Sequence, residues 1–305
     1  MTTRRRKRRS LLVPLLALAA CAGLVAVYFW RDRETAPRPS AATEPTPIPL
    51  VVERSAARAP ARTPRRGSAP GAADFESAAA ERRPALALVV DDVGFDLASI
   101  QRLGELDGPL ALAVIPSAPH AKEAAALAAR KKWDLLVHLP MSGADGAPSE
   151  ADAVGPADDD ATIAARVGRA IDAVPGARGL NNHQGSRATA DPRVVRAVLE
   201  VVGTRGLFFL DSRTSPKTVA EREARRLGIP AVARDVFLDD AATEAAAPGG
   251  VADALEKAWK SALSVAARKG SCVLVAHPRK ETLDFLAARL ASAPARRVKV
   301  SELAD

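Results

Sequence analysis

The stretch ALALVVDDVGF, residues 85–95, joins a continuous apolar run directly to two adjacent carboxylates. Residues 85–90 are typical of a strand that is buried on both faces, because the run has no polar residue. A charged group at the end of such a strand is costly unless it is paired or binds a metal. Asp91 and Asp92 therefore either cap the next helix or hold a ligand, and the rest of the chain decides between these roles.

From Pro84 onward, short apolar runs alternate with Ala-rich amphipathic stretches, which is typical of βα units. Seven strands alternating with helices form either a barrel or an open doubly wound sheet, and no Gly-rich dinucleotide loop follows the first strand to favour the open sheet. The predicted strands cover residues 85–90, 110–115, 134–139, 179–182, 206–210, 230–237 and 272–276. The predicted helices cover about residues 97–107, 118–131, 159–173, 191–203, 217–227, 250–269 and 280–292.

The N-terminal part of the chain predicts where the protein is located. Residues 1–10 are basic, and residues 11–30 form an uncharged run of twenty residues, about the length of a membrane-spanning helix. Basic residues before such a helix stay in the cytoplasm. We therefore expect a basic cytoplasmic tail, a single-pass inner-membrane anchor and a folded domain in the periplasm. A cleaved signal peptide and a lipoprotein modified at Cys21 are the alternatives, and all three export the domain.

Residues 31–83 are rich in Pro, Ala, Arg, Thr and Ser and have no sustained apolar period. Such a segment buries too little surface to offset its ordering entropy, so we predict a disordered linker. The net charge of +8 is concentrated in this N-terminal third of the chain, so it is no argument for a nucleic-acid partner. With only two cysteines, a thiolate zinc site is excluded, and any metal must be bound by histidines and carboxylates.

Polar residues gather where the predicted strands end. Three of the four histidines, His138, His183 and His277, lie at these ends, and His120 is expected on the surface. Active sites of parallel βα barrels are built at the carboxyl ends of the strands. One such histidine alone is usually structural, but three of them with paired carboxylates favour a metal site. The other polar residues at these ends are Asn181, Asn182, Ser186, Asp211, Ser212, Arg213, Arg234, Asp235, Asp239, Asp240 and Arg279.

The segments VVDDVG, VHLPM, NNHQGS, LDSRT, RDVFLDD and AHP, in this order and spacing, resemble the divergent polysaccharide deacetylase family. That family is a distant branch of the NodB-type carbohydrate esterases, and the resemblance covers about residues 84–303. It implies an α/β fold with a seven-stranded (β/α) barrel over residues 84–305. It also implies a metal-dependent hydrolase that removes N-acetyl or O-acetyl groups from a cell-envelope polysaccharide such as peptidoglycan.

The resemblance also implies roles for single residues. Asp91 would be the general base, Asp92 a metal ligand and His277 the general acid. The closely spaced histidine pair of the relatives is incomplete here, because LPMSG follows His138. His183 is the natural substitute, which gives Asp92, His138 and His183 as ligands of a divalent ion, Zn²⁺ first and Co²⁺ or Mn²⁺ otherwise. Two imidazoles and one carboxylate leave open positions on such an ion, as catalytic zinc sites require.

The arginine–proline motif of the standard enzymes is absent, so Arg213 or Arg234 would have to orient a carboxylate. We also place Asp211 among the catalytic residues. The expected substrate-binding residues are Asn182, Ser186, Asp235 and Arg234. The alternative functions are a catalytically inactive barrel that binds envelope glycan or protein, and a metal hydrolase that acts on another ester or amide.

Several of these residues also have a purely structural interpretation. Asp96 is a better helix N-cap than Asp92. Asn181 and Asn182 fit a role in pinning their loop by hydrogen bonds better than contact with substrate. Asp239 and Asp240 are equally well explained as solvated loop acids. Ser186 lies outside any G-x-S-x-G sequence, which disfavours a serine hydrolase.

Overall fold

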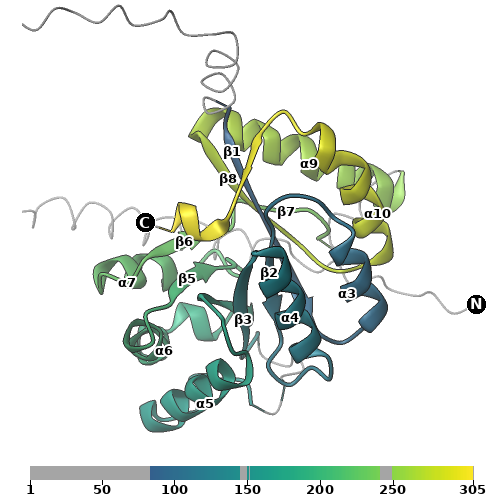
Figure 1. Cartoon of the computed structure of the whole chain (residues 1–305). Coiled ribbons are helices and arrows are strands. Elements are labelled where there is room, and N and C mark those ends of the chain that lie inside the picture. The colour runs from purple at the N-terminus through teal and green to yellow at the C-terminus, as the bar shows by residue number, and fades with distance from the viewer. Residues whose placement is uncertain (1–82, 145–149, 151, 241–248, 305) are drawn as a thin grey trace, which may run out of the picture. The chain divides into compact units, whose positions relative to one another are not determined.

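The computed structural model of the chain describes residues 83–144, 150, 152–240 and 249–304 (Figure 1). The predicted tail, membrane anchor and disordered linker lie outside these residues, apart from the end of the linker at Arg83. These features stay predictions. Among the helices that the structure describes, none combines the length and the apolar composition of a membrane span.

One parallel sheet forms the centre of the domain. Its strand order is β6-β5-β4-β3-β2-β1-β8-β7, with β9 paired to β1. Because every pairing is parallel, the carboxyl ends of the strands meet at one edge of the sheet. The strands are β1 (Ala85–Val93), β2 (Ala111–Val114), β3 (Asp134–Met141), β4 (Gly179–Gln184), β5 (Phe208–Asp211), β6 (Ala231–Ala233), β7 (Val236–Phe237), β8 (Ser271–Ala276) and β9 (Arg296–Val298).

Helices connect the strands and lie around the outside of the sheet (Figure 1). Three begin at aspartates whose carboxylates accept backbone N–H groups of the first turn, and Asp96 does so for α3, as predicted. The helices are α3 (Leu97–Gly104), α4 (Ala121–Lys131), α5 (Asp160–Ala173), α6 (Pro192–Thr204), α7 (Ala220–Arg226), α9 (Gly250–Lys269) and α10 (Lys280–Arg289), with 3₁₀ turns η1 (Ala188–Ala190), η2 (Leu290–Ser292) and η3 (Val300–Leu303).

The segment that contains β6 and β7 lies between the two ends of the strand order. β6 pairs with β5 and β7 pairs with β8, although only two residues separate them. The N–H of Arg234 donates to Asp211 of β5, and the N–H of Asp235 donates to Val273 of β8. The sheet therefore curls back on itself through this segment, in agreement with the predicted (β/α) barrel. The predicted strand over residues 230–237 is divided into two, and β9 was not predicted.

Alternate residues along the strands pack into two apolar clusters. In β1, Leu86, Leu88 and Val90 pack against the helices, whereas Ala85, Ala87 and Val89 fill the inside of the curled sheet. Both faces of each strand are thus buried, which explains why the strand sequences are continuously apolar. The same alternation decides which polar residues face the interior further along each strand.

The C-terminal segment fills the interior at the amino-terminal end of the strands. β9 pairs with Ala85–Ala87 at the start of β1, and Val298, Val300 and Ala304 join the inner cluster. Asp134, fully buried at the start of β3, accepts a hydrogen bond of 2.9 Å from the N–H of Ser301. This end of the sheet is therefore covered and mainly apolar, and the predicted site residues lie at the opposite end.

Candidate metal and proton-transfer site

Strand alternation turns four polar side chains of separate strands towards the interior. Asp91 follows Val89 by two residues, and His138 follows Leu136 of the same inner cluster by two residues. His277 follows Val275 by the same spacing, directly after β8. His183 of β4 pairs in register with Pro140, two residues beyond His138. These four residues were predicted as site residues, and the structure brings them together.

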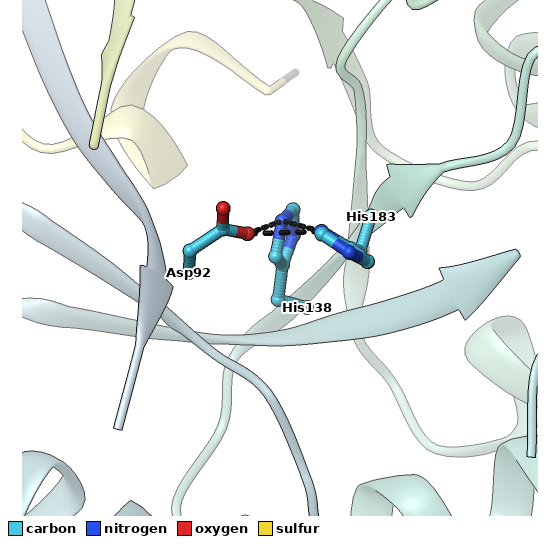
Figure 2. A group of neighbouring side chains, drawn as sticks. All are labelled: Asp92, His138 and His183. Carbon is cyan, nitrogen blue, oxygen red and sulfur yellow. Dashed lines mark hydrogen bonds and ion pairs between the residues drawn. The ribbon is translucent and has the colours of Figure 1, made fainter. Parts of the chain in front are cut away.

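Asp92 reaches the site through an irregularity in β1. Regular alternation would turn its side chain away from Asp91, but the pairing with β2 shifts register between Val90 and Val93. Asp92 has a φ of 55°, the left-handed conformation that non-glycine residues rarely adopt. Its carboxylate faces His138 and His183 as a result (Figure 2). The two aspartates lie within β1 rather than beyond its end, which corrects the predicted strand boundary.

Three potential ligand atoms lie close together. Asp92 Oδ1 is 3.1 Å from His138 Nε2 and 2.9 Å from His183 Nδ1, and the two nitrogens are 3.2 Å apart (Figure 2). Donor atoms at about 2.0–2.1 Å from a tetrahedral zinc ion lie about 3.3 Å from one another. Asp92 Oδ1 is also buried and, within the described part of the chain, has no partner in hydrogen-bonding geometry. The three residues therefore fit a divalent cation.

The charges within this cluster shift the pKa values of its members. Burial acts to raise the pKa of Asp92, but His138 and His183 outweigh it and hold that pKa well below its usual range. Burial acts to lower the pKa of His138, but the carboxylates of Asp91 and Asp92 outweigh it, and the pKa is raised. The pocket thus favours positive charge beside ionised carboxylate.

A buried amide connects Asp91 to the cluster. Asn181 Nδ2 donates to Asp91 Oδ1 at 2.8 Å, and Asn181 Oδ1 lies 2.9 Å from His138 Nδ1. The other carboxylate oxygen, Asp91 Oδ2, is 3.7 Å from His138 Nε2. Burial is the main cause that raises the pKa of Asp91. Asn181 was predicted only as a residue that pins its loop, and its contact with two site residues was missed.

His277 lies on the other side of Asp92 and is oriented by Asp239. His277 Nε2 is 3.9 Å from Asp92 Oδ2, and His277 Nδ1 is 2.8 Å from Asp239 Oδ1. The second oxygen of Asp239 accepts bonds of 2.8 Å from the N–H of His277 and from Thr282 Oγ1. Burial acts to lower the pKa of His277, but the hydrogen bond with Asp239 outweighs it and raises the pKa. Asp239 is fully buried, so its interpretation as a solvated loop acid is wrong.

The two arginines expected to orient a carboxylate have other partners. Arg234 Nε donates to the carbonyl of Ser212 at 2.6 Å, and its guanidinium lies 3.8 Å from the centre of the Phe237 ring. Arg213 has a φ of 46°, and its guanidinium pairs with Glu221 at 2.7 Å. Arg234 lies near enough to Asp91 for their charges to interact. The hydrogen bond that fixes Asp91, however, comes from Asn181.

Three other predicted site residues accept hydrogen bonds from backbone N–H groups and so fix the backbone near the strand ends. Asp211 accepts bonds from the N–H of Arg213 and from Thr218 Oγ1, both at 2.8 Å, within the loop that follows β5. Asn182 accepts a bond of 2.9 Å from the N–H of Ser212. Asp235 accepts from the N–H of Val273 and pairs with Lys269. Asn182 and Asp211 each follow an inward-facing position, Asn181 and Leu210, by one residue, so alternation turns their side chains outward.

A groove lies beside the cluster, between β3 and α5. Its volume is about 550 Å³, and Glu150 connects it to the cluster, because Glu150 Oε1 is 3.6 Å from His183 Nε2. Glu150 was not predicted as a site residue. The predicted Ser186 is partly buried in the loop after β4. The apolar lining of the groove consists of Phe95, Pro116, Leu139, Pro140, Ala170 and Ala173.

The chain is similar to known bacterial proteins in both sequence and fold. A sequence model described as divergent polysaccharide deacetylase matches residues 88–305. An uncharacterized protein of Haemophilus influenzae is 34% identical over 209 residues, which cover 68% of this chain and 72% of that protein. The uncharacterized protein YibQ of Escherichia coli is 32% identical over 201 residues, which cover 66% of this chain and 60% of YibQ. An uncharacterized protein of Agrobacterium tumefaciens has a similar fold, with a TM-score of 0.64 and 23% identity over 73% of this chain and 89% of that one.

Proposed function

Because the chain belongs to the divergent polysaccharide deacetylase family, we propose that it is a metal-dependent hydrolase of a cell-envelope polysaccharide. It would remove N-acetyl or O-acetyl groups, with peptidoglycan or a related glycan as the substrate class. One observation carries the proposal. Asp92, His138 and His183 converge on one point, and Asp91 and His277, both of which can transfer protons, flank that point.

Asp92, His138 and His183 would hold the divalent ion. When bound, Zn²⁺, Co²⁺ or Mn²⁺ lowers the pKa of a water molecule and polarises an acyl carbonyl. Asp91 would accept the proton of the attacking water on Oδ2, because Asn181 already occupies Oδ1. His277 would donate a proton from Nε2 to the leaving amine or alcohol, and Asp239 fixes the hydrogen on Nδ1. The raised pKa of His277 supports its role as the acid.

The groove between β3 and α5 would hold the sugars next to the acetylated one. Phe95, which is 54% exposed, offers an aromatic ring at the groove, two residues beyond the end of β1, the strand that carries the two aspartates. Arg166 and Arg169 of α5 add hydrogen-bond donors to the apolar lining. Ligand sites commonly combine apolar walls with a few polar groups in this way.

Metal content and acetate release together test the function. Purified protein is supplied with zinc, cobalt or manganese at neutral pH, its bound metal is measured, and acetate release is followed on N-acetylated and O-acetylated glycans. We expect one divalent ion per chain and acetate release that depends on it. Asp92→Ala, His138→Ala and His183→Ala should each lose the metal. His120→Ala is the matched control, since the imidazole of His120 pairs with Glu123 of α4 at 3.8 Å and does not belong to the ligand cluster.

Two results would count against the proposal in different ways. Protein that binds no divalent ion under these conditions has no such ligand set, and a non-catalytic binding barrel then becomes the better interpretation. Protein that binds the metal but releases no acetate from any glycan would support the metal site and contradict the deacetylase activity.

The location of the domain outside the cytoplasm remains part of the proposal and rests on residues 1–30 alone. Protease added to cells with an opened outer envelope should digest the domain, and protection from the protease would reverse the topology.

A further inference from the structure

We propose that Asn181 is a positioning residue with two separable tasks, one for each end of its carboxamide. The oxygen end fixes His138 for metal binding, and the nitrogen end fixes Asp91 for proton transfer. This inference rests on the proposed function and deepens it, because it divides the work of the site between the two ends of one side chain.

The position of Asn181 makes both contacts possible. It pairs in register with His138 across β3 and β4, on the inner face of the sheet, and its side chain is fully buried. Its Nδ2 donates to Asp91 Oδ1 at 2.8 Å and to Ser212 Oγ at 3.2 Å, and its Oδ1 lies 2.9 Å from His138 Nδ1. The Nδ2 group therefore has two acceptors, and Oδ1 lies against one ring nitrogen.

The neighbours of the amide decide which way it points. When Asp91 is ionised, as its role as a base requires, a rotation that exchanged Nδ2 and Oδ1 would set an oxygen against its carboxylate, where neither atom carries a hydrogen. The orientation with nitrogen towards Asp91 is therefore the favourable one. Because Oδ1 can only accept, it selects the His138 tautomer that carries its hydrogen on Nδ1. The lone pair of Nε2 is then directed at Asp92 and His183, where the metal would bind.

The nitrogen end acts on the other residue. By donating to Asp91 Oδ1, Asn181 holds the carboxylate with Oδ2 on the side of the cluster, 3.7 Å from His138 Nε2. No charged side chain serves both partners. An aspartate would accept from His138 but repel Asp91, and an arginine would donate to Asp91 but could not accept from His138. A neutral carboxamide meets both requirements at once.

Two substitutions separate the two tasks. Asn181→Asp keeps an oxygen opposite His138 and loses the donor to Asp91. We expect metal affinity no weaker than that of the wild type, with kcat lower by about 10²-fold at saturating metal, since removal of an aligned proton carrier costs on the order of 10²–10⁴-fold. Asn181→Leu loses both contacts. We expect its metal affinity to fall by about 10–100-fold, as for other residues that orient a metal ligand, with the same loss of kcat.

The measurements are metal dissociation constants, the visible spectrum of the cobalt-loaded protein, and kcat and KM at saturating metal. Asn182→Asp is the matched control, because it places the same new charge on the adjacent buried asparagine, which pins loop backbone. That control should lower the thermal midpoint. It should not show the pattern expected for Asn181→Asp, in which kcat falls while metal affinity is kept. If Asn181→Leu fails to fold, Asn181→Ala replaces it.

A loss of metal affinity and kcat in the same proportion in both Asn181 variants would overturn the inference, because it would show a general structural role. A wild-type protein that binds metal but releases no acetate would instead remove the proposed function. The metal affinities of the two variants would then still test the oxygen end of Asn181.

Discussion

The two ends of the curled sheet use the same strands for opposite purposes. At the amino-terminal end, Val298, Val300 and Ala304 complete an apolar cluster, and Asp134 is tied to the backbone of Ser301. At the carboxyl end, the positions that continue the same inner face carry Asp91, His138, Asn181 and His277. The amino-terminal end buries mainly apolar groups, and the carboxyl end buries carboxylates beside imidazoles.

Strained backbone conformations are also concentrated at the carboxyl end of the sheet. Asp92, Gln184 and Arg213 have left-handed φ values of 55°, 53° and 46°, and all three lie where β1, β4 and β5 end or give way to loops. The remaining non-glycine residue of this kind among the described residues, Lys132, is the C-cap of α4 and serves a common helix ending. Strain of this kind often marks functional sites. The comparison teaches that packing at the amino-terminal end stabilises the domain, whereas the backbone conformations and buried charges at the carboxyl end destabilise it.

The sharpest test of the comparison removes a proton carrier from the polar end. His277→Ala should lower kcat by about 10²–10⁴-fold, the usual loss for a general acid, while metal stays bound. His277 is 3.9 Å from the nearest oxygen of Asp92, so it lies beside the ligand set rather than within it. Turnover and metal content measured on the same samples check this. Loss of the metal would place His277 among the ligands.

Truncation of a large apolar side chain at the amino-terminal end should instead lower stability and leave activity unchanged. Leu86 lies at the start of β1 and is 1% exposed. Leu86→Ala should lower the free energy of unfolding by about 2–5 kcal/mol, because it leaves a cavity in the core. Denaturant unfolding measures the loss, and metal affinity and kcat of the folded protein should not change. A variant that also lost metal would show that the two ends are coupled.

Acid should weaken metal binding at the carboxyl end of the sheet. The pKa of His138 is raised, since Asp91 and Asp92 outweigh the effect of burial, so His138 holds its proton to higher pH than an ordinary histidine. A metal must displace that proton, and below the raised pKa its affinity should fall by about tenfold for each unit of pH. Titrations between pH 5.5 and pH 8 measure the slope. An affinity that is constant over this range would exclude His138 as a ligand.

The smallest expected effect compares strain at the two ends. Gln184→Gly and Lys132→Gly each place glycine where the left-handed conformation costs other residues about 1 kcal/mol. Both side chains are exposed, so little packing is lost. Each variant should gain up to about 1 kcal/mol in stability, as measured by denaturant unfolding. A gain for Lys132→Gly but none for Gln184→Gly would show that the contacts around β4 already offset its strain.

Most of the fold could be predicted because the strands are buried on both faces. Each predicted strand overlaps at least one observed strand, and the short, charged β9 escaped detection because it lacks an apolar run. His138, His183 and His277 were identifiable because they end apolar strands. Strand alternation by itself turns Asp211 outward and Asn181 inward, which is where the structure has them.

Two features of the site could not be read from local sequence. The inward turn of Asp92 depends on a register shift against β2, which is a property of the pairing of two strands. The role of Asp239 depends on His277, which lies 38 residues further along the chain. Both features arise from tertiary contacts, on which local pattern carries no information.

The segment that joins β6 to β7 also bears on aggregation. It supplies the pairing on one side of β5 and on one side of β8, through Arg234 and Asp235 at its centre. If this segment detached, the curled sheet would become an open sheet with two free edges, formed by apolar strands that contain Phe209 and Leu274. Free apolar edges readily pair with another chain. This short connection therefore protects the domain against edge-to-edge association, and its local opening is the event that a solubility screen of variants should monitor.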